Sequence, residues 1–358
     1  MNRECIYIAG PECFYTGGFD QLNAMRRLAE ANGFSVSLPN DMPLKLDHED
    51  LRENADAIFQ NCADSMNRST AILCDLEFFR GPEVDAGSVF EIGMAYARGI
   101  ACYGYTRDKR DMKWKYQGLV LRDGLPYDRK GRVLPYWDLP FSPNVVGSTK
   151  IIEGGFWDCL KLYLTDLEES RKRGEVSAMK PPKSAPTGDK RKPVLYFAGP
   201  ERYDADAQQR YMMMKRVCDA YGYTVVTPMD GRQDECDDPY TRAYRTLERN
   251  QNHVHDCDII VANLNDFHGW EPESDTAFEC GMAYQLGKRM YGYMDSSVHM
   301  RERVPNLGAE NGWRDICGCN VENFDYPLNL MFSSSMKILE GKFEQVIAQI
   351  AEDLLRNK

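Results

Sequence analysis

Two stretches of the sequence decide its organisation: "SVFEIGMAYARG" at residues 88–99 and "TAFECGMAYQLG" at residues 276–287. Each predicts a helix that is rich in small residues and carries a glutamate near its start. The two glutamates, Glu91 and Glu279, stand in nearly the same frame, 188 positions apart. A chain that carries the same glutamate twice must first be searched for an internal repeat.

Three further landmarks repeat in the same order and with an offset of 188 or 189 residues. They are "IYIAGPE" (6–12) and "LYFAGPE" (195–201), "ANGFSVSLP" (31–39) and "AYGYTVVTP" (220–228), and "YGY" (103–105 and 291–293). This period is far too long for a solenoid repeat. The pattern predicts a duplicated domain.

A linker is expected between the two copies. Residues 169–193, "ESRKRGEVSAMKPPKSAPTGDKRKP", are rich in Pro, Lys and Arg and poor in large apolar side chains, which is typical of an exposed connection. We therefore place the first domain at residues 1–168, the linker at 169–192 and the second domain at 193–358. The basic clusters of this segment could be a localisation signal, but a solvated linker explains them more simply.

Length, charge and composition narrow the function classes. The chain has 358 residues, which suits two domains, and a net charge of -11, which argues against nucleic-acid binding. No apolar run approaches the length of a membrane span, and no signal peptide is recognisable at the start. The twelve cysteines show no framework of paired spacings, so we expect reduced thiols in a cytoplasmic protein.

Strand and helix patterns alternate in each copy. In the first copy, short apolar strands are expected at "CIYIAG", "FSVSLP", "TAILCDL" and "ACYGY", with helices between them. In the second copy, "SSSMKILEGKFEQVIAQIAEDLL" is expected to form the closing helix. The pattern predicts an α/β fold of two tandem flavodoxin-like (Rossmann-like) three-layer domains with parallel sheets. Because ligands bind at the carboxyl ends of such strands, the "AGPE" loops and the segments before Glu91 and Glu279 should rim one pocket in each copy.

Several motifs allow more than one interpretation. The glycine of "AGP" could let a phosphate approach the backbone, but a tight turn explains it equally well, and no G-x-G-x-x-G or P-loop lysine follows. Glu91 could be a nucleophile, or the acid of a capping box with Ser88, at roughly even odds. Asp85 stands six residues before Glu91, and paired carboxylates suit glycosidic-bond chemistry. "HVHDCD" (253–258) alternates its side chains between opposite faces of a helix, so no metal site is expected there.

Taken in order, these motifs resemble those of the nucleoside 2-deoxyribosyltransferases. The family pattern is an opening "iYlAGP" segment followed by D-x-G-[ST]-x-x-E-[LI]-G, and "DAGSVFEIG" (85–93) fits it closely. "ESDTAFECG" (273–281) departs from the pattern at Glu273 and Asp275. The resemblance covers both copies apart from the linker.

The resemblance implies a role for individual residues. Glu91 and Glu279 fall at the family's nucleophile, Asp85 and Glu273 at an acid that holds the sugar hydroxyls. Tyr7 and Tyr196 fall at a first-strand tyrosine that contacts the nucleophile region. In the family, a neighbouring subunit lends an asparagine, for which "PLNLMFSS" (327–334) offers Asn329 and "SPNVVGST" (142–149) offers Asn144. The remaining expected substrate-binding residues are Gly10, Ser88, Gly199 and Thr276. A further family acid aligns with Cys62 and Asn250, which leaves the proton donor unassigned.

The implied reaction is a double displacement on 2′-deoxynucleosides and free nucleobases, with a glutamyl–deoxyribosyl intermediate and no cofactor or metal. The two copies would pair as an intrachain pseudo-dimer, with Asn329 serving Glu91 and Asn144 serving Glu279; further homo-oligomers are possible. Two alternatives stay open: an N-glycosidase that uses water, and a nucleoside-binding protein with one or both sites inactive. The first site is expected to be the more competent, because Asp275 replaces the small Gly87 and would raise the pKa of Glu279.

Overall fold

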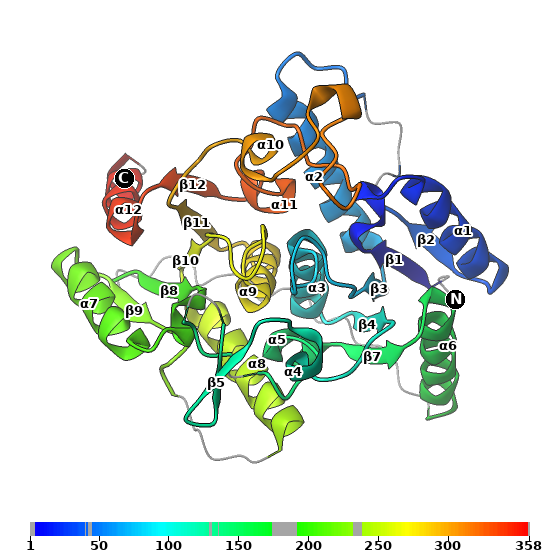
Figure 1. Cartoon of the computed structure of the whole chain (residues 1–358), viewed down its shortest axis with the longest axis horizontal. Coiled ribbons are helices and arrows are strands. Elements are labelled where there is room, and N and C mark those ends of the chain that lie inside the picture. Colours follow the sequence, from blue (N-terminus) through cyan, green and yellow to red (C-terminus); the bar gives the residue numbers. More distant parts are fainter. Residues whose placement is uncertain are drawn as a thin grey trace.

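The chain folds into two parallel five-stranded sheets, one in each half (Figure 1). This computed structural model describes residues 4–39, 41, 45–128, 131–134, 136–173, 192–231 and 238–356. The sheet orders are β2-β1-β3-β4-β7 in the first half and β9-β8-β10-β11-β12 in the second. Counted within each half, both orders are 2-1-3-4-5, the flavodoxin-like arrangement. The predicted α/β fold with two tandem three-layer domains is confirmed.

The elements of the first half are β1 (Cys5–Ala9), η1 (Pro11–Phe14), α1 (Gly18–Ala31), β2 (Ser35–Ser37), α2 (Leu51–Arg68), β3 (Ala71–Asp75), α3 (Ala86–Arg98), β4 (Ala101–Thr106), α4 (Met112–Lys115), β5 (Val120–Arg122), β6 (Leu125–Tyr127), α5 (Pro143–Ser148), β7 (Lys150–Glu153) and α6 (Phe156–Arg173). The elements of the second half are β8 (Val194–Ala198), η2 (Pro200–Tyr203), α7 (Ala207–Ala220), β9 (Thr224–Val226), α8 (Pro239–Asp256), β10 (Ile259–Asn263), α9 (Ser274–Gln285), β11 (Arg289–Met294), α10 (Met300–Arg303), η3 (Ala309–Asn311), α11 (Leu330–Ser333), β12 (Lys337–Glu340) and α12 (Phe343–Arg356).

Each sheet separates an outer from an inner apolar layer. Successive side chains of a strand point to opposite faces, so Ile6 and Ile8 of β1 pack outward with α1 and α6, whereas Tyr7 and Ala9 pack inward. The outer face of the second sheet is covered by α7 and α12 in the same way. The inner layers of the two halves merge into one buried cluster that includes side chains of α2, α3, α8 and α9. The inward direction of Tyr7 matters because it aims this side chain at α3.

The two halves meet where α3 and α9 cross at the centre of the molecule (Figure 1). A Cβ on Gly93 would lie 2.1 Å from the carbonyl oxygen of Phe278, and a Cβ on Gly281 would lie 1.9 Å from that of Phe90. Both distances are far below van der Waals contact, so the helices can approach this closely only with glycine at both positions. These glycines follow Glu91 and Glu279 by two residues.

Helices of each half also pack on the other half, and charged side chains pair across this interface. Helix α5 of the first half packs on α8 of the second, and α11 of the second half packs on α2 of the first. The buried Arg80 of the first half pairs with Glu271 at 3.4 Å and with Asp315 at 3.1 Å. In the corresponding place of the second half, His268 contacts Glu83 of the first half at 3.3 Å. The halves therefore form an intrachain pseudo-dimer.

Two predicted element boundaries need correction, and one strand was missed. Residues 169–173, which we assigned to the linker, are the last residues of α6, where Leu160 and Tyr163 hold the helix on the outer face of the first sheet. Residues 337–340 form the edge strand β12 rather than part of the closing helix, because they pair with β11. The matching edge strand β7 was not predicted. The remaining linker residues 174–191 lie outside the described part of the chain.

No helix within the described residues has both the length and the apolar composition that a membrane crossing requires.

The glycine contact gives a stability prediction. Alanine is intrinsically better than glycine in a helix interior by about 1 kcal/mol, yet Gly93→Ala should lower the free energy of unfolding by about 3 kcal/mol or more, because the methyl group meets a backbone carbonyl. Gly155→Ala is the control, since a Cβ there meets no atom within 4 Å. Urea unfolding of both variants makes the comparison. Equal stability of Gly93→Ala and the unmodified chain would contradict the close helix contact.

Candidate active site

The first site forms at the carboxyl ends of β1 and β3. Strand β1 ends at Ala9 and leads through Gly10 into η1, while β3 ends at Asp75 and leads through a loop into α3. A Cβ on Gly10 would lie 2.1 Å from Oε2 of Glu12 and 2.8 Å from Cβ of Asp75. The glycine of "AGP" is thus required for close packing of two loops. As predicted, the "AGPE" loop and the segment before Glu91 rim one cavity.

The start of α3 overturns the capping-box interpretation of Glu91. The N-cap is Asp85, whose Oδ2 accepts hydrogen bonds from the Ser88 backbone N–H at 2.8 Å and from the Ser88 hydroxyl at 2.6 Å. Glu273 caps α9 in the same way and accepts from the Thr276 N–H at 2.7 Å. Glu91 lies one turn further along its helix and is free for another role.

Glu91 is held by Tyr7, whose hydroxyl donates a hydrogen bond to Oε1. The glutamate is 6% exposed. Burial raises the pKa of its carboxyl to about 8, the bond from Tyr7 lowers the pKa, and the nearby charge of Asp85 raises it. The tyrosine therefore stabilises the ionised form that a nucleophile needs.

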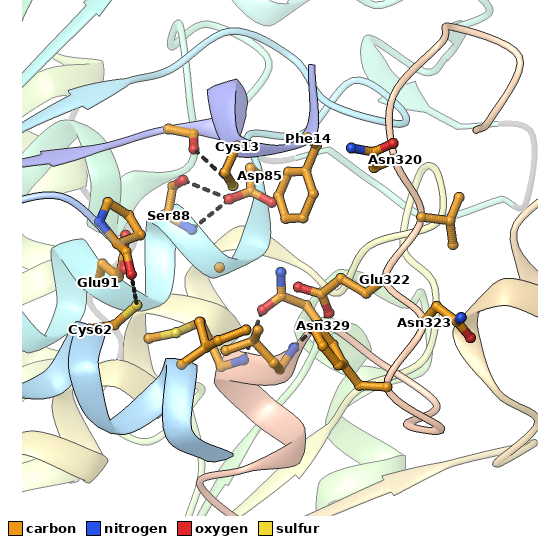
Figure 2. Close-up of a pocket in the computed structure, with 18 of the residues that line it drawn as sticks. Cys13, Phe14, Cys62, Asp85, Ser88, Glu91, Asn320, Glu322, Asn323 and Asn329 are labelled. Atoms are coloured by element: carbon orange, nitrogen blue, oxygen red, sulfur yellow. Dashed lines mark hydrogen bonds between the residues drawn. The ribbon is translucent and has the colours of Figure 1, made fainter. Parts of the chain in front are cut away.

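Glu91 opens on a cavity of about 700 Å³, a volume that suits a small organic ligand. Figure 2 shows Glu91, Asp85 and Ser88 facing side chains of the second half across this space. Asn329, at the start of α11, lines the cavity. A Cβ on Gly87 would lie 2.9 Å from Nδ2 of Asn329, so a larger residue at position 87 would displace the asparagine.

One of the two carboxylate oxygens of Asp85 is available to a ligand. Its side chain is 3% exposed, and Oδ1 makes no hydrogen bond of ordinary geometry with the described residues. Burial raises the pKa of the Asp85 carboxyl, against the opposing effect of the Ser88 bonds. A buried acceptor without a partner costs free energy, and a ligand hydroxyl in the adjoining cavity could satisfy it.

The second site has the same backbone but a different interior. Arg202 occupies the position that corresponds to Cys13, and its guanidinium donates to both carboxylate oxygens of Glu279, at 3.2 and 3.0 Å. Asn250 donates to Oε1 of Glu279 at 2.9 Å. Glu279 is 0% exposed. Burial raises the pKa of Glu279, whereas the charge and hydrogen bonds of Arg202 lower it.

The other predicted residues of the second site gather around this ion pair. Asn144, from the first half, lies 3.4 Å from Oε1 of Glu279. Asp275 accepts from the Asn144 backbone N–H at 2.8 Å. Tyr196 is buried nearby, but its hydroxyl makes no hydrogen bond of ordinary geometry within the described chain. The sequence analysis expected Asp275 to raise the pKa of Glu279. In the structure the carboxylate that raises this pKa is Glu273, and the guanidinium of Arg202 lowers it.

Aromatic side chains cover the second site. Tyr203, which corresponds to Phe14, donates a hydrogen bond to Glu273 at 3.0 Å. Its ring is buried in a cluster with Leu134, Tyr136 and Phe267. Glu273 is itself 0% exposed. Gly199 repeats the close packing of Gly10, here against Glu201. The first site is thus open to a ligand, and the charges of the second site are satisfied within the protein.

Comparison with known families decides the relationship. The family model described as nucleoside 2-deoxyribosyltransferase matches residues 6–135 and 195–331. The chain belongs to the nucleoside 2-deoxyribosyltransferase family. The two matched segments agree with the tandem duplication, and this family chain carries one copy of the domain in each half. No curated protein sequence matches it.

Three solved structures with similarity to this deoxyribosyltransferase family member each cover less than half of this chain. A 2-desoxiribosyltransferase from Leishmania mexicana is 26% identical and covers 45% of this chain and 97% of its own, with a TM-score of 0.38. A conserved protein from Enterococcus faecalis V583 is 16% identical over 47% of this chain and 99% of its own, with a TM-score of 0.30. A 2-deoxyribosyltransferase from Bacillus psychrosaccharolyticus is 20% identical and covers 28% of this chain and 71% of its own, with a TM-score of 0.22.

Some site residues of this family member were not predicted. Arg202 could have been found, because "PERY" replaces "PECF" when the two copies are aligned. Glu322 lines the first cavity from the second half, and no repeated motif marks it. Cys62, which the sequence analysis aligned with a further acid of the family pattern, also lines the first cavity. "HVHDCD" ends helix α8 as expected, and His253 contacts the Asp230 carbonyl at 3.1 Å; the described residues contain no cluster of metal ligands.

The contact between Tyr7 and Glu91 gives a pH prediction. A nucleophilic Glu91 must be ionised, so the rate should rise as the pH rises through its pKa. Tyr7→Phe removes a bond that lowers this pKa, and the acid limb of kcat/KM should move about one pH unit upward, since a hydrogen bond to a charged group is worth about 1.5–3 kcal/mol. Tyr103→Phe is the control, because its hydroxyl bonds Asp166 at 2.7 Å on the outer face. An acid limb unchanged by Tyr7→Phe would contradict the assignment.

Proposed function

We propose that the first site transfers 2-deoxyribose between nucleobases by double displacement. The observation that carries the proposal is the placement of Glu91, a tyrosine-bonded carboxylate, on the wall of a cavity of about 700 Å³ that Asn329 of the other half also lines. Membership of the deoxyribosyltransferase family supports the same reaction class. The substrates would be 2′-deoxynucleosides and free nucleobases.

In this proposal, each side chain takes a step that is consistent with its contacts. An oxygen of Glu91 attacks C1′ of the deoxynucleoside, the C1′–N bond breaks, and its electron pair leaves with the base. Tyr7 favours the ionised form of the attacking carboxylate, because its hydrogen bond lowers the pKa of Glu91, and it orients that carboxylate. Asp85 presents its unpartnered Oδ1 to a sugar hydroxyl. A second base then attacks C1′ of the glutamyl ester from the vacated face, so the two inversions retain the configuration.

In this proposal, the second site is inactive. Glu279 is bonded at both oxygens by Arg202 and is shielded from solvent. Attack by Glu279 would require the ion pair to separate in a buried place, where an unpaired charge is strongly unfavourable. The second half instead contributes Asn329 and the neighbouring cavity wall to the first site.

The test is base exchange between a 2′-deoxynucleoside and a different free base. The unmodified chain should form a new deoxynucleoside, Glu91→Gln should lose at least about a hundredfold in kcat, and Glu279→Gln should keep nearly full activity. Chromatography of the products separates the alternatives: free deoxyribose alone would mean an N-glycosidase, and no product would mean a binding protein. A larger loss in Glu279→Gln than in Glu91→Gln would reverse the ranking of the two sites.

Asn329 gives a separate prediction about the composite site. Its Oδ1 caps α11 by accepting from the Met331 N–H at 2.9 Å, and serine is an equally good N-cap. Asn329→Ser should therefore keep the fold but lose the amide that faces the substrate, at a cost of about a hundredfold in kcat. Asn311→Ser, on an exposed helix of the same half, is the control.

Mixing experiments decide whether the site is completed within one chain. Glu91→Gln and Asn329→Ser each disable one part of the first site. If the second half of the same chain completes the site, a mixture of the two proteins should be no more active than the separate proteins. Activity that appears only on mixing would show that separate chains complete each other.

A further inference from the structure

We propose that Glu322, from the second half, is the general acid and base for the nucleobase at the first site. This inference rests on the proposed deoxyribosyl transfer and names the group that the family alignment leaves unassigned. Glu322 lines the cavity together with Glu91 and Asp85. In Figure 2, Glu91 lies at the left, Glu322 lies to the right of the centre, and Asp85 lies above the space that separates them.

The geometry of a displacement at C1′ would place the base on the same side of the cavity as Glu322. A nucleophile attacks C1′ from the face opposite the leaving group. With Glu91 on one wall and the sugar beside Asp85, the base must extend away from Glu91. Glu322 and Asn323 line the cavity on the side away from Glu91, and the ring of Phe14 lies beside Asp85 (Figure 2). An aromatic ring can stack on a flat heterocycle, and polar groups can bond its edge.

Contacts with the first half fix the segment that carries Glu322. The Asn320 backbone N–H donates to the Phe14 carbonyl at 2.7 Å, and Arg80 donates to the Asn320 carbonyl. Arg80 is itself bound to Asp315 and Glu271. All four contacts cross between the halves, so the pseudo-dimer interface determines where Glu322 lies.

One oxygen of Glu322 is occupied and the other is available. Oε2 accepts a hydrogen bond from the Leu330 backbone N–H at 2.8 Å. Oε1 has no hydrogen-bond partner among the residues that the structure describes. A carboxyl group held at one oxygen in a cavity wall presents its other oxygen to the ligand. A proton carried on Oε1 could be donated to a ring nitrogen or an exocyclic oxygen of a base.

The surroundings favour a protonated Glu322 at neutral pH. Burial raises the pKa of its carboxyl to about 8. The Leu330 N–H and the Arg80 guanidinium lower this pKa, whereas the charges of Glu271 and Asp85 raise it. The cavity thiols of Cys13 and Cys62 add no charge, because burial raises the pKa of both far above neutrality. Glu91 and Glu322 then have opposite requirements: the nucleophile works ionised and the acid works protonated.

Glu322 loses one proton in the first step and regains one in the second. When the C1′–N bond breaks, the Oε1 proton passes to the base, and Glu322 becomes a carboxylate bonded by the Leu330 N–H and attracted by Arg80. When the second base arrives, this carboxylate takes the proton from the base as its nitrogen attacks C1′. Glu91 is released, Glu322 is protonated again, and no further reactant is needed.

The test compares two leaving groups. An ordinary 2′-deoxynucleoside needs a proton on its departing base, whereas p-nitrophenyl 2-deoxy-β-ribofuranoside releases p-nitrophenolate without one. Glu322→Gln should slow glycosyl-enzyme formation from the deoxynucleoside by about 10²–10⁴-fold, while the burst of p-nitrophenolate keeps its rate within a few-fold. The amide oxygen of Gln can still accept from the Leu330 N–H. Glu310→Gln is the matched control, in the same half on an exposed helix.

The unmodified protein supplies a second measurement that needs no variant to fold. Its rate on the deoxynucleoside should fall as the pH rises through the pKa of Glu322, and the burst on the p-nitrophenyl substrate should lack this alkaline limb. Equal losses on both substrates in Glu322→Gln, or an alkaline limb shared by both substrates, would overturn the role of Glu322 and leave the transferase proposal standing. No reaction of the unmodified protein with either substrate would overturn both proposals.

Discussion

The contact between α3 and α9 is the constraint on which the rest of the structure depends. Gly93 and Gly281 let each helix approach a carbonyl oxygen of the other so closely that no side chain could intervene. Because Glu91 lies two residues before Gly93, the packing that joins the halves also fixes the position of the Glu91 carboxylate relative to the second half. The same approach brings Asn329 over Gly87 and closes the cavity wall opposite Glu91. The same helix packing therefore forms the interface between the halves and positions the residues of the first site.

The two sites show how few side chains separate an open site from a closed one. Backbone, N-cap and glutamate are repeated in both halves. In the first site, position 13 holds a cysteine that lines the cavity; in the second, Arg202 extends to Glu279 and its charge is neutralised there. A buried carboxylate needs either a ligand or an internal partner. The first half leaves Glu91 with a tyrosine and a cavity, and the second half satisfies Glu279 with an arginine.

The sequence was sufficient for the architecture and for the residues that repeat. Strand periodicity predicted the parallel sheets. Aligned motifs pointed to Asp85, Glu91 and Asn329, which line one cavity, and to Tyr7, which bonds Glu91. Prediction from the sequence failed where contacts between distant parts of the chain determine the structure. The edge strand at 337–340 exists only through its pairing with β11, and local pattern merged it with the following helix. The spacing of Ser88 and Glu91 also left a capping box open as an alternative, which the N-cap at Asp85 excludes. Glu322 could not be predicted, since its relation to Glu91 arises only when the halves dock.

A tandem chain permits an asymmetry that a symmetric dimer cannot have. In a homodimer of identical subunits, every substitution appears in both sites, so an arginine that occupies one site would occupy the other. Once the copies are joined, the second half can replace a cavity residue with Arg202 and cover the site with Tyr203, while the first keeps Cys13 and Phe14. The second half must still keep α9, α11 and the segment around Glu322, because these complete the first site. Duplication thus allows one half to keep an open cavity while the other half supplies part of its wall, and that second half stays under the geometric constraint of the shared helix contact.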